Sequence, residues 1–223
     1  MNTNMTLSQL IEMEDHVPTL AGFASRLCSR STYEDWITRL YIDIDDYIAR
    51  SIITSASIRQ KDEEDRYNIE IANHLNMIGY DAGHDTFNKG HPDIIVNDKI
   101  HGYQWLGESK IHRKYDDLLE GFKQLSDRYS SGNYKQNHGA VIIINRGGNT
   151  AKVVNKWKEM LIEDPFYKSR SIKAEICTQN KDCFISTHEH TGSSNDYTVR
   201  HIPINVYYKP VDKSAKKSKA KNK

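Results

Sequence analysis

The run GAVIIIN, from Gly139 to Asn145, sets the tightest limit on the fold of this chain. Its residues 140–144 are all apolar, whereas a strand with one face in water alternates apolar and polar side chains. An unbroken apolar run of this length is typical of a strand that is buried on both faces. Two more β-rich runs precede it, at 92–96 (PDIIV) and 103–111 (YQWLGESKI), with turn-forming Asn, Asp and Gly between them. We therefore expect an α/β fold in which this strand lies inside a sheet.

Helical patterns fill the chain before these strands. Residues 6–60 contain few glycines or prolines and repeat apolar side chains at helical spacing, so we expect a helical N-terminal region. Ser31-Thr32 followed by Glu34-Asp35 marks a helix start, because acids in the first turn interact favourably with the helix dipole. Another helix is expected from Asp62 to Ile78, ended by Gly79. The residues expected on its inward face are Glu64, Asn68, Ile71, Leu75 and Ile78.

Two more helices are expected next to the GAVIIIN strand. Residues 115–129 (YDDLLEGFKQLSDRY) place Leu118, Phe122 and Leu125 on one face, and residues 149–164 (NTAKVVNKWKEMLIED) follow the strand. Further strands are expected near 171–177, 183–190 and 203–208. The chain shows no internal repeat and no sharp domain boundary before its last residues.

Charge is distributed unevenly along the 223 residues. The net charge is +1, but residues 213–223 (KSAKKSKAKNK) hold six lysines and no acid, which leaves 25 basic against 30 acidic residues in 1–212. Such a tail cannot bury enough apolar surface to fold, so we expect it to be disordered. It serves either as a solubilising end or as a loose attraction to phosphate.

The composition also bears on where the protein works. No apolar run approaches the length of about 18 residues that a bilayer span requires. The start, MNTNMTLSQLIEMEDH, lacks the basic region and apolar stretch of a secretory signal, and three irregularly spaced cysteines do not indicate a disulfide framework. We expect a cytoplasmic protein with no membrane partner.

Asp93, Glu108 and Lys110 are the strongest candidates for a functional site. Glu108 and Lys110 are two residues apart on a strand, so their side chains leave the same face. Asp93 begins the preceding strand. If the segment DKIHG connects the two strands, antiparallel pairing puts Asp93 opposite Glu108; a tight turn at the Asn-Asp pair would instead put it opposite Gly102. We prefer the longer connection.

Two carboxylates at this separation repel each other and raise each other's proton affinity. A divalent cation removes this conflict, and Mg²⁺ is commonly held by one or two carboxylates, waters and a phosphate oxygen. A metal so placed generates hydroxide and stabilises charge on phosphorus, while Lys110 would orient the attacking water or neutralise the phosphate. These residues suit phosphodiester hydrolysis with Mg²⁺, for which Mn²⁺ is expected to substitute. The alternative is an ion-paired strand pair with a purely structural role, since a Glu-x-Lys triplet occurs about once by chance in such a chain.

The strings HPDIIV and GESK together resemble the PD-(D/E)xK nuclease superfamily. The resemblance covers roughly residues 62–145. It implies a restriction-endonuclease-like core of a helix, a three-strand antiparallel meander, a helix and a further strand. It also implies that Asp93 is the first metal ligand, Glu108 the second and Lys110 the catalytic lysine, with the main-chain carbonyl of Ser109 as an additional ligand. On this interpretation residues 1–61 are a helical region packed on the core, and residues 62–212 are the nuclease domain with a C-terminal β-rich extension.

The resemblance points to two further residues. The family often carries an acid on the helix before the meander, and Glu64 is our choice because it shares the inward face, with Glu63 and Glu70 as alternatives. GFKQLSDRY resembles the helix with Gln and Tyr in some branches of the superfamily, and Gln124 matches the glutamine. Residues expected to contact phosphate are His91, Arg113 and Lys114.

We expect a Mg²⁺-dependent endonuclease that cleaves DNA, in restriction or anti-phage defence. It would act as a homodimer through its N-terminal helices or as part of a multi-protein complex. One alternative is a non-catalytic nucleic-acid-binding or interaction module on the same fold, and another is an RNA-directed nuclease. The defence setting rests on analogy.

Two other clusters are given ordinary interpretations. Cys177, Cys183, His188, His190 and His201 match no zinc spacing, so we expect exposed histidines and small buried cysteines. In VYYKP, strand alternation would bury one of the two tyrosines and expose the other, although such a pair could also stack on bases.

Overall fold

The structure is a computed structural model that describes residues 5–17, 20–86 and 89–211. The lysine-rich tail expected from residue 213 lies outside these ranges. The helices are α1 (Leu7–His16), α2 (Phe23–Cys28), α3 (Tyr33–Tyr47), α4 (Glu64–Met77), α5 (Tyr115–Lys123), α6 (Thr150–Glu163) and α7 (Pro165–Lys168). The strands are β1 (Asp81–His84), β2 (Ile94–Asp98), β3 (Tyr103–Ile111), β4 (His138–Asn145), β5 (Lys173–Ile176), β6 (Phe184–Glu189) and β7 (Asp196–Asn205). Within the described residues, no helix is both long enough and apolar enough to cross a bilayer.

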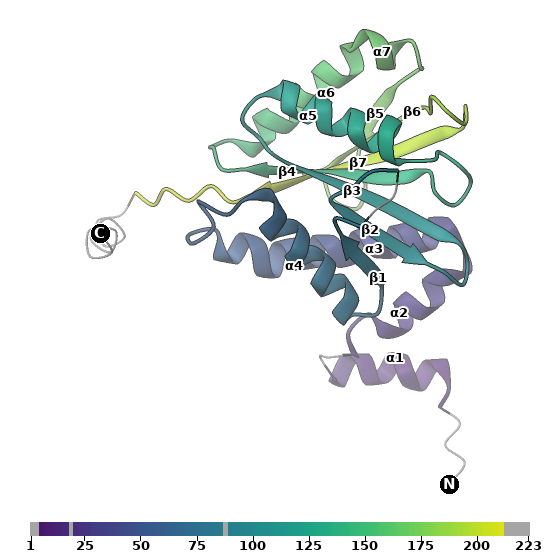
Figure 1. Ribbon diagram of the computed structural model, residues 1–223. Coiled ribbons are helices and arrows are strands. Elements are labelled where there is room, and N and C mark those ends of the chain that lie inside the picture. Colours follow the sequence, from purple (N-terminus) through teal and green to yellow (C-terminus); the bar gives the residue numbers. More distant parts are fainter. Residues whose placement is uncertain (1–4, 18–19, 87–88, 212–223) are drawn as a thin grey trace.

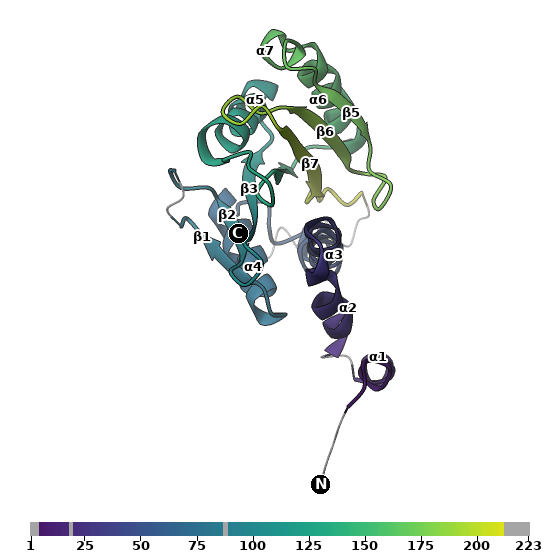
Figure 2. The same ribbon diagram turned by 90° about the vertical axis from the view of Figure 1, so that its right-hand side faces the viewer.

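The described strands form one mixed seven-stranded sheet in the order β1-β2-β3-β4-β7-β6-β5. β1, β2 and β3 are an antiparallel meander, β4 lies parallel to β3, and β7 lies parallel to β4. Helices cover both faces: α3 and α4 lie on one side, and α5, α6 and α7 on the other (Figure 1). The expected α/β class is confirmed as a mixed sheet between two helical layers, which Figure 2 shows from the side.

Each face of the sheet has its own hydrophobic core. β4 contributes alternately to both, since Ile142 and Ile144 belong to the cluster under α3 and α4 while Val141 and Ile143 belong to the cluster under α5 and α6. All four side chains are fully buried. The expectation that this strand is buried on both faces is therefore confirmed, and each of these side chains contributes roughly 1.5–3 kcal/mol by leaving water.

Helix α3 begins where the Ser31-Thr32 pair predicts. The Thr32 hydroxyl accepts a hydrogen bond from the Asp35 backbone N–H over 3.1 Å, at the expected start of α3. α3 packs directly on the sheet, with Trp36, Leu40 and Ile44 at or below 1% exposure. α1 lies farthest from the sheet, beyond α2 (Figure 1).

Two strands differ from expectation. No strand was expected at residues 81–84, but they form β1, which pairs with β2 from Asp81↔Asn97 to His84↔Ile94. β7 begins at Asp196, seven residues before the expected start at 203, and it ends at Asn205. Because β7 ends there, Tyr207 and Tyr208 lie beyond the strand, and both are exposed rather than alternately buried, at 43% and 39%.

Candidate active site

The β2–β3 pair brings Asp93 to Glu108. Ile94 pairs with Gly107 at the end of the ladder, so the next residues along the two chains, Asp93 and Glu108, stand opposite each other. The preferred register is confirmed, although β2 extends to Asp98 and the connection is correspondingly shorter. One Asp93 carboxylate oxygen accepts a hydrogen bond from the backbone N–H of Ser109 over 2.7 Å.

Glu108 and Lys110 share the face of β3 that α5 covers. The Lys110 ammonium lies 2.8 Å from one Glu108 carboxylate oxygen. The other oxygen, Oε2, is buried and has no hydrogen-bond partner among the described residues. A buried anionic oxygen without a donor is costly, so this position suits a cation.

Burial and the neighbouring charges shift the pKa values of Asp93, Glu108 and Lys110. Burial, with the neighbouring Asp93 carboxylate, raises the pKa of Glu108 to about 7. Burial also raises the pKa of Asp93, although the Ser109 N–H opposes this. For Lys110, burial favours the neutral amine, but the Glu108 carboxylate outweighs it and the pKa of Lys110 is raised. The site thus has one firm positive charge and two carboxylates that resist being ionised together.

Glu64 reaches the same site from α4. It is the first residue of that helix, and its carboxylate accepts a hydrogen bond from the Ile111 backbone N–H over 2.7 Å, at the end of β3. Its charge acts on both Lys110 and Asp93. The alternatives lie elsewhere: Glu63 is exposed, and Glu70 forms ion pairs with Arg59 at 2.7 Å and with Arg66.

An open cleft of about 230 Å³ lies beside these residues. Glu64, Lys110, Arg113 and Gln124 line it, together with Ile111, Asp117 and Glu120. The Gln124 side-chain carbonyl is buried and has no partner among the described residues. Gln124 also starts a π-helical turn that continues α5 to Tyr129, and such turns often occur at functional sites.

The other two cations expected to contact phosphate lie farther from the cleft. Lys114 does not line it, and its ammonium lies 3.5 Å from Asp117. The His91 ring is 56% exposed and lies 3.1 Å from Asp85. His91 therefore sits on the surface just before Asp93, and Arg113 is the one of the three predicted residues that the structure brings to the cleft.

Three residues support the site, and of these only Tyr129, as the tyrosine of GFKQLSDRY, matches a residue of the family resemblance. Gly121 of α5 faces the ion pair so closely that an added Cβ would lie 2.9 Å from Lys110 Cγ. Asn68 is fully buried and accepts a hydrogen bond from the Ser109 hydroxyl over 2.5 Å. Tyr129 is buried, and its pKa is raised by burial and by the nearby charge of Glu108. A glycine inside a helix pattern was the available signal for the first of these.

The cysteine and histidine cluster forms no second site. Cys177 and Cys183 are buried as expected, but His188 and His190 are also buried, at 1% and 4% exposure. Burial lowers the pKa of His188 to about 4, and the ring packs against Phe122 and Tyr167. In the described part of the chain, no group of three or more His, Cys, Asp or Glu residues is placed to hold a metal ion.

Asp93, Glu108, Lys110 and Glu64 thus meet at the ends of β2 and β3, with Gln124 and Arg113 at the rim. Comparisons of the chain with protein-family models, with curated proteins and with solved structures find no match.

Proposed function

We propose that the protein is a metal-dependent endonuclease that hydrolyses phosphodiester bonds of DNA. One observation carries the proposal: Asp93 and Glu108 face each other across two paired strands, with Lys110 held 2.8 Å from Glu108 beside an open cleft. Glu108 is buried and Asp93 is partly buried. Two such carboxylates next to an ammonium that lines an open cleft are arranged as a phosphate-cleaving site requires. An ion-paired strand pair with a structural role has no need of the cleft or of the orphaned Glu108 oxygen.

The order of elements supports a restriction-endonuclease-like core. α4 is followed by the β1–β2–β3 meander, then by α5 and by β4. In this core the three functional side chains come from the start of β2 and the end of β3. The motif residues and the order of elements both support this family.

The donor set fits Mg²⁺. Two carboxylates are fewer ligands than a fully protein-bound metal needs, but Mg²⁺ commonly keeps several waters and takes one or two carboxylates. Asp93 and Glu108 would hold it, with the Ser109 carbonyl as a third donor, and the unpartnered Glu108 Oε2 is the free ligand atom. When bound, the metal would lower the pKa of the attacking water and neutralise charge on the phosphate.

The residues divide the remaining work. In the hydrolysis, a water molecule gives up one proton as its oxygen bonds to phosphorus, the bond from phosphorus to the leaving oxygen breaks, and the leaving oxygen takes up one proton, so that the net reaction adds one water across the bond. Lys110 stabilises the negative charge that develops on the phosphate. Glu64 accepts the Ile111 N–H and so fixes the end of β3. Gln124 and Arg113, on the rim, orient the substrate.

A cleavage assay on supercoiled plasmid DNA with Mg²⁺ or Mn²⁺ tests the proposal. The wild-type protein should produce nicked or linear DNA, and Asp93→Asn should produce neither. Calorimetric titration with Mn²⁺ gives a readout that does not depend on activity, since the substitution should weaken binding at least tenfold. Absence of both cleavage and Mn²⁺ binding in the wild type would contradict the proposal.

Two rival functions are separated by the same assay. A non-catalytic nucleic-acid-binding or interaction module would bind DNA and leave it intact with either metal. An RNA-directed nuclease would cut single-stranded RNA and spare DNA. We place the enzyme in the cytoplasm, in restriction or anti-phage defence, as a homodimer or as the nuclease of a larger complex; gel filtration with and without residues 1–31 tests the dimer.

A further inference from the structure

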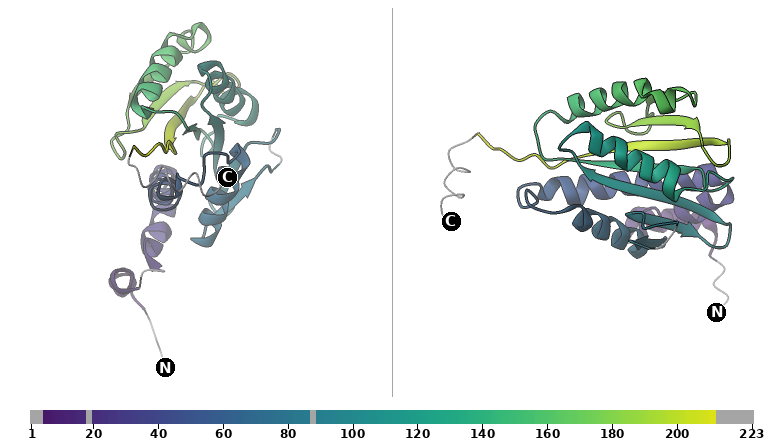
Figure 3. Two further views of the ribbon diagram at one scale, coloured as in Figure 1. Left: turned by 90° about the vertical axis from the view of Figure 1, so that its left-hand side faces the viewer. Right: turned by 45° about the horizontal axis from the view of Figure 1, so that its top comes forward.

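The candidate site lies where the parallel strands β3, β4 and β7 have their carboxyl ends, and we call this end of the strands the carboxyl edge of the sheet. Ile111 of β3 pairs with Ile144 of β4, and Asn145 of β4 pairs with Asn205 of β7, so the segments that follow these strands emerge side by side. With neighbouring strands about 4.8 Å apart, the end of β7 lies roughly 10 Å from the end of β3. The right-hand view of Figure 3 shows the segment after β7 leaving the body at this edge.

Arg146, directly after β4, is a cation without a counter-ion among residues 5–17, 20–86 and 89–211. It is partly buried, and its Nε and Nη2 atoms are enclosed and have no hydrogen-bond partner in the part of the chain that the structure describes. No carboxylate of the described residues lies within ion-pair distance of it. Its guanidinium lies beside the hydroxyl of Tyr67 on α4, where its charge opposes the rise that burial causes in the pKa of Tyr67. An enclosed guanidinium without an anion is costly, so the site suits an anion supplied by a ligand.

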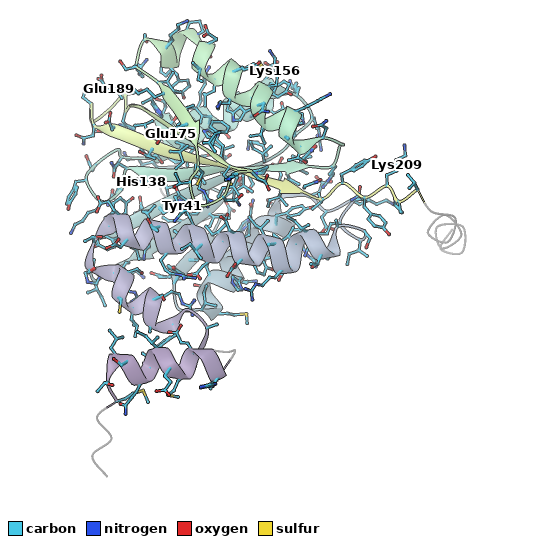
Figure 4. All side chains as sticks on the ribbon, turned by 180° about the vertical axis from the view of Figure 1, so that it is seen from behind. Tyr41, His138, Lys156, Glu175, Glu189 and Lys209 are labelled. Atoms are coloured by element: carbon cyan, nitrogen blue, oxygen red, sulfur yellow. The ribbon has the colours of Figure 1, made fainter. Side chains whose placement is uncertain are left out.

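The segment after β7 lies against the same place. The Val206 N–H donates to the Asn145 carbonyl over 3.0 Å, and the Gln60 side chain donates to the Val206 carbonyl. These bonds fix the backbone, yet the rings of Tyr207 and Tyr208 are 43% and 39% exposed. The Tyr207 ring lies beside Gly148, two residues after Arg146. The segment then runs away from the sheet through Lys209, labelled in Figure 4.

We propose that this edge is a track for an unpaired strand of the nucleic-acid substrate. Arg146 binds a backbone phosphate and Tyr207 stacks on a base. The proposal rests on the nuclease function proposed above and narrows its substrate to a strand that is unpaired beside the scissile bond. Stacking on an exposed tyrosine needs the free face of a base, which a duplex hides, and a guanidinium contacts phosphate whatever the sequence.

The distribution of charge supports a path for the nucleic-acid strand past Arg146. Among the described residues, three carboxylates (Glu64, Asp93 and Glu108) act on Lys110 or on one another, while Arg113 lines the adjoining cleft. Further positive charge beside the site would favour binding of a phosphate chain. Arg146 supplies this charge on the α4 side of the strand ends. Aromatic rings next to an unpaired cation are the usual components of a single-strand binding surface.

Binding to the Asp93→Asn protein in EDTA tests the track without cleavage. Fluorescence anisotropy compares a labelled single-stranded oligodeoxynucleotide with a blunt duplex of the same length over a range of NaCl concentrations. The Asp93→Asn protein is the parent. Adding Tyr207→Leu to this parent should weaken single-strand binding by about 5- to 100-fold and change duplex binding less than about twofold. Adding Arg146→Gln should reduce the slope of log affinity against log salt by about 0.7 for the single strand.

Matched controls separate the track from folding. Tyr134→Leu removes a tyrosine that is 75% exposed on another loop, and Arg170→Gln removes a guanidinium stacked on Phe166; neither should alter binding. Tyr67→Phe removes the hydroxyl beside Arg146 and should leave single-strand affinity unchanged, whereas equal losses in Tyr67→Phe and Arg146→Gln would mean that Arg146 is structural and would overturn its assignment. Arg146→Lys retains the charge if Arg146→Gln fails to fold, and should keep the salt slope of the parent.

Two outcomes distinguish failure of the track from failure of the enzyme. In the first, the wild type cleaves DNA, but Tyr207→Leu either binds single strands as tightly as the parent or loses the same affinity for single strands and for duplex. Either result would overturn the proposed track and leave the proposed nuclease function unaffected. If the wild type cleaves neither polymer and the parent binds neither, both proposals are overturned.

Discussion

Asp93 and Glu108 face each other across the β2–β3 pair, and Lys110 is the ammonium that both carboxylates act on. Asp93 is held by the Ser109 N–H at 2.7 Å and Glu108 by Lys110 at 2.8 Å. Burial raises the pKa of both carboxyl groups. The metal-free protein therefore holds two acids in a place that opposes their joint ionisation, a cost that a functional role explains.

Replacing Glu108 with Gln should stabilise the metal-free protein at pH 8. A carboxyl group whose pKa is raised by folding destabilises the native state once it ionises, so this cost is absent below about pH 4.5, grows through the window up to about 7, and is complete above it. We expect Glu108→Gln to increase the free energy of unfolding by about 1–3 kcal/mol at pH 8 and by little at pH 5. Urea denaturation in EDTA at pH 8 and at pH 5 measures this free energy of unfolding.

Glu189→Gln, an exposed change on β6, is the control and should alter stability by less than about 0.5 kcal/mol at either pH. Destabilisation of Glu108→Gln at pH 8 would mean that the Glu108–Lys110 ion pair is a net structural contribution.

Lys110→Ala should abolish cleavage and leave DNA binding nearly intact. The ammonium is placed to stabilise charge that develops in the transition state, so its loss should lower kcat by at least about a hundredfold. Single-turnover cleavage and anisotropy in EDTA separate the two quantities. Lys173→Ala, on the exposed β5 edge, should cleave like the wild type, and parallel losses of binding and cleavage in Lys110→Ala would point to a binding role instead.

Gly121→Ala should impair cleavage with little effect on stability. In a helix this change normally adds up to about 1 kcal/mol of stability, but here the new methyl group would lie 2.9 Å from Lys110 Cγ and 3.0 Å from Cε. The lysine must move, so we expect the cleavage rate at saturating DNA to fall at least about tenfold. Lys123→Ala, exposed on the same helix, is the control. Cleavage by Gly121→Ala at the wild-type rate would show that the position of Lys110 is not critical.

Buried histidines should make the protein sensitive to acid. His188 is 1% exposed, and burial lowers its pKa to about 4, so it stabilises the native state fully above about pH 6.5 and this contribution is lost as the pH falls toward 4. When the pH is lowered from 7 to 5, we expect the free energy of unfolding of His188→Leu to fall by about 2 kcal/mol less than that of the wild type. Urea denaturation at the two values tests this, and identical losses would contradict the buried neutral ring.

The sequence predicted those parts of the fold that depend on local patterns. The unbroken apolar run of β4, the Thr32 cap of α3 and the face of α4 that carries Asn68 and Ile71 all follow from periodicity and capping. The position of Asp93 opposite Glu108 could be predicted because a strand register is fixed once its connection is known.

Features that depend on tertiary contacts could not be predicted in this way. β1 is four residues long and contains Gly83, so it has no alternating pattern, and it is a strand because β2 pairs with it. His188 is buried because aromatic rings from α5, α7 and β7 surround it, and the rings of Phe122 and Tyr167 come from helices far from it in the sequence. Asn68 and Gly121 support the site from two separate helices, which a single sequence does not connect.

A crystal soaked in Mn²⁺ tests the central claim most directly. Anomalous scattering locates the ion without reference to any substrate. We predict a peak within about 2.0–2.3 Å of a carboxylate oxygen of both Asp93 and Glu108, which should vanish in Asp93→Asn. A fully soaked crystal with no peak between these two residues, or with Asp93 turned away from Glu108, would contradict the account.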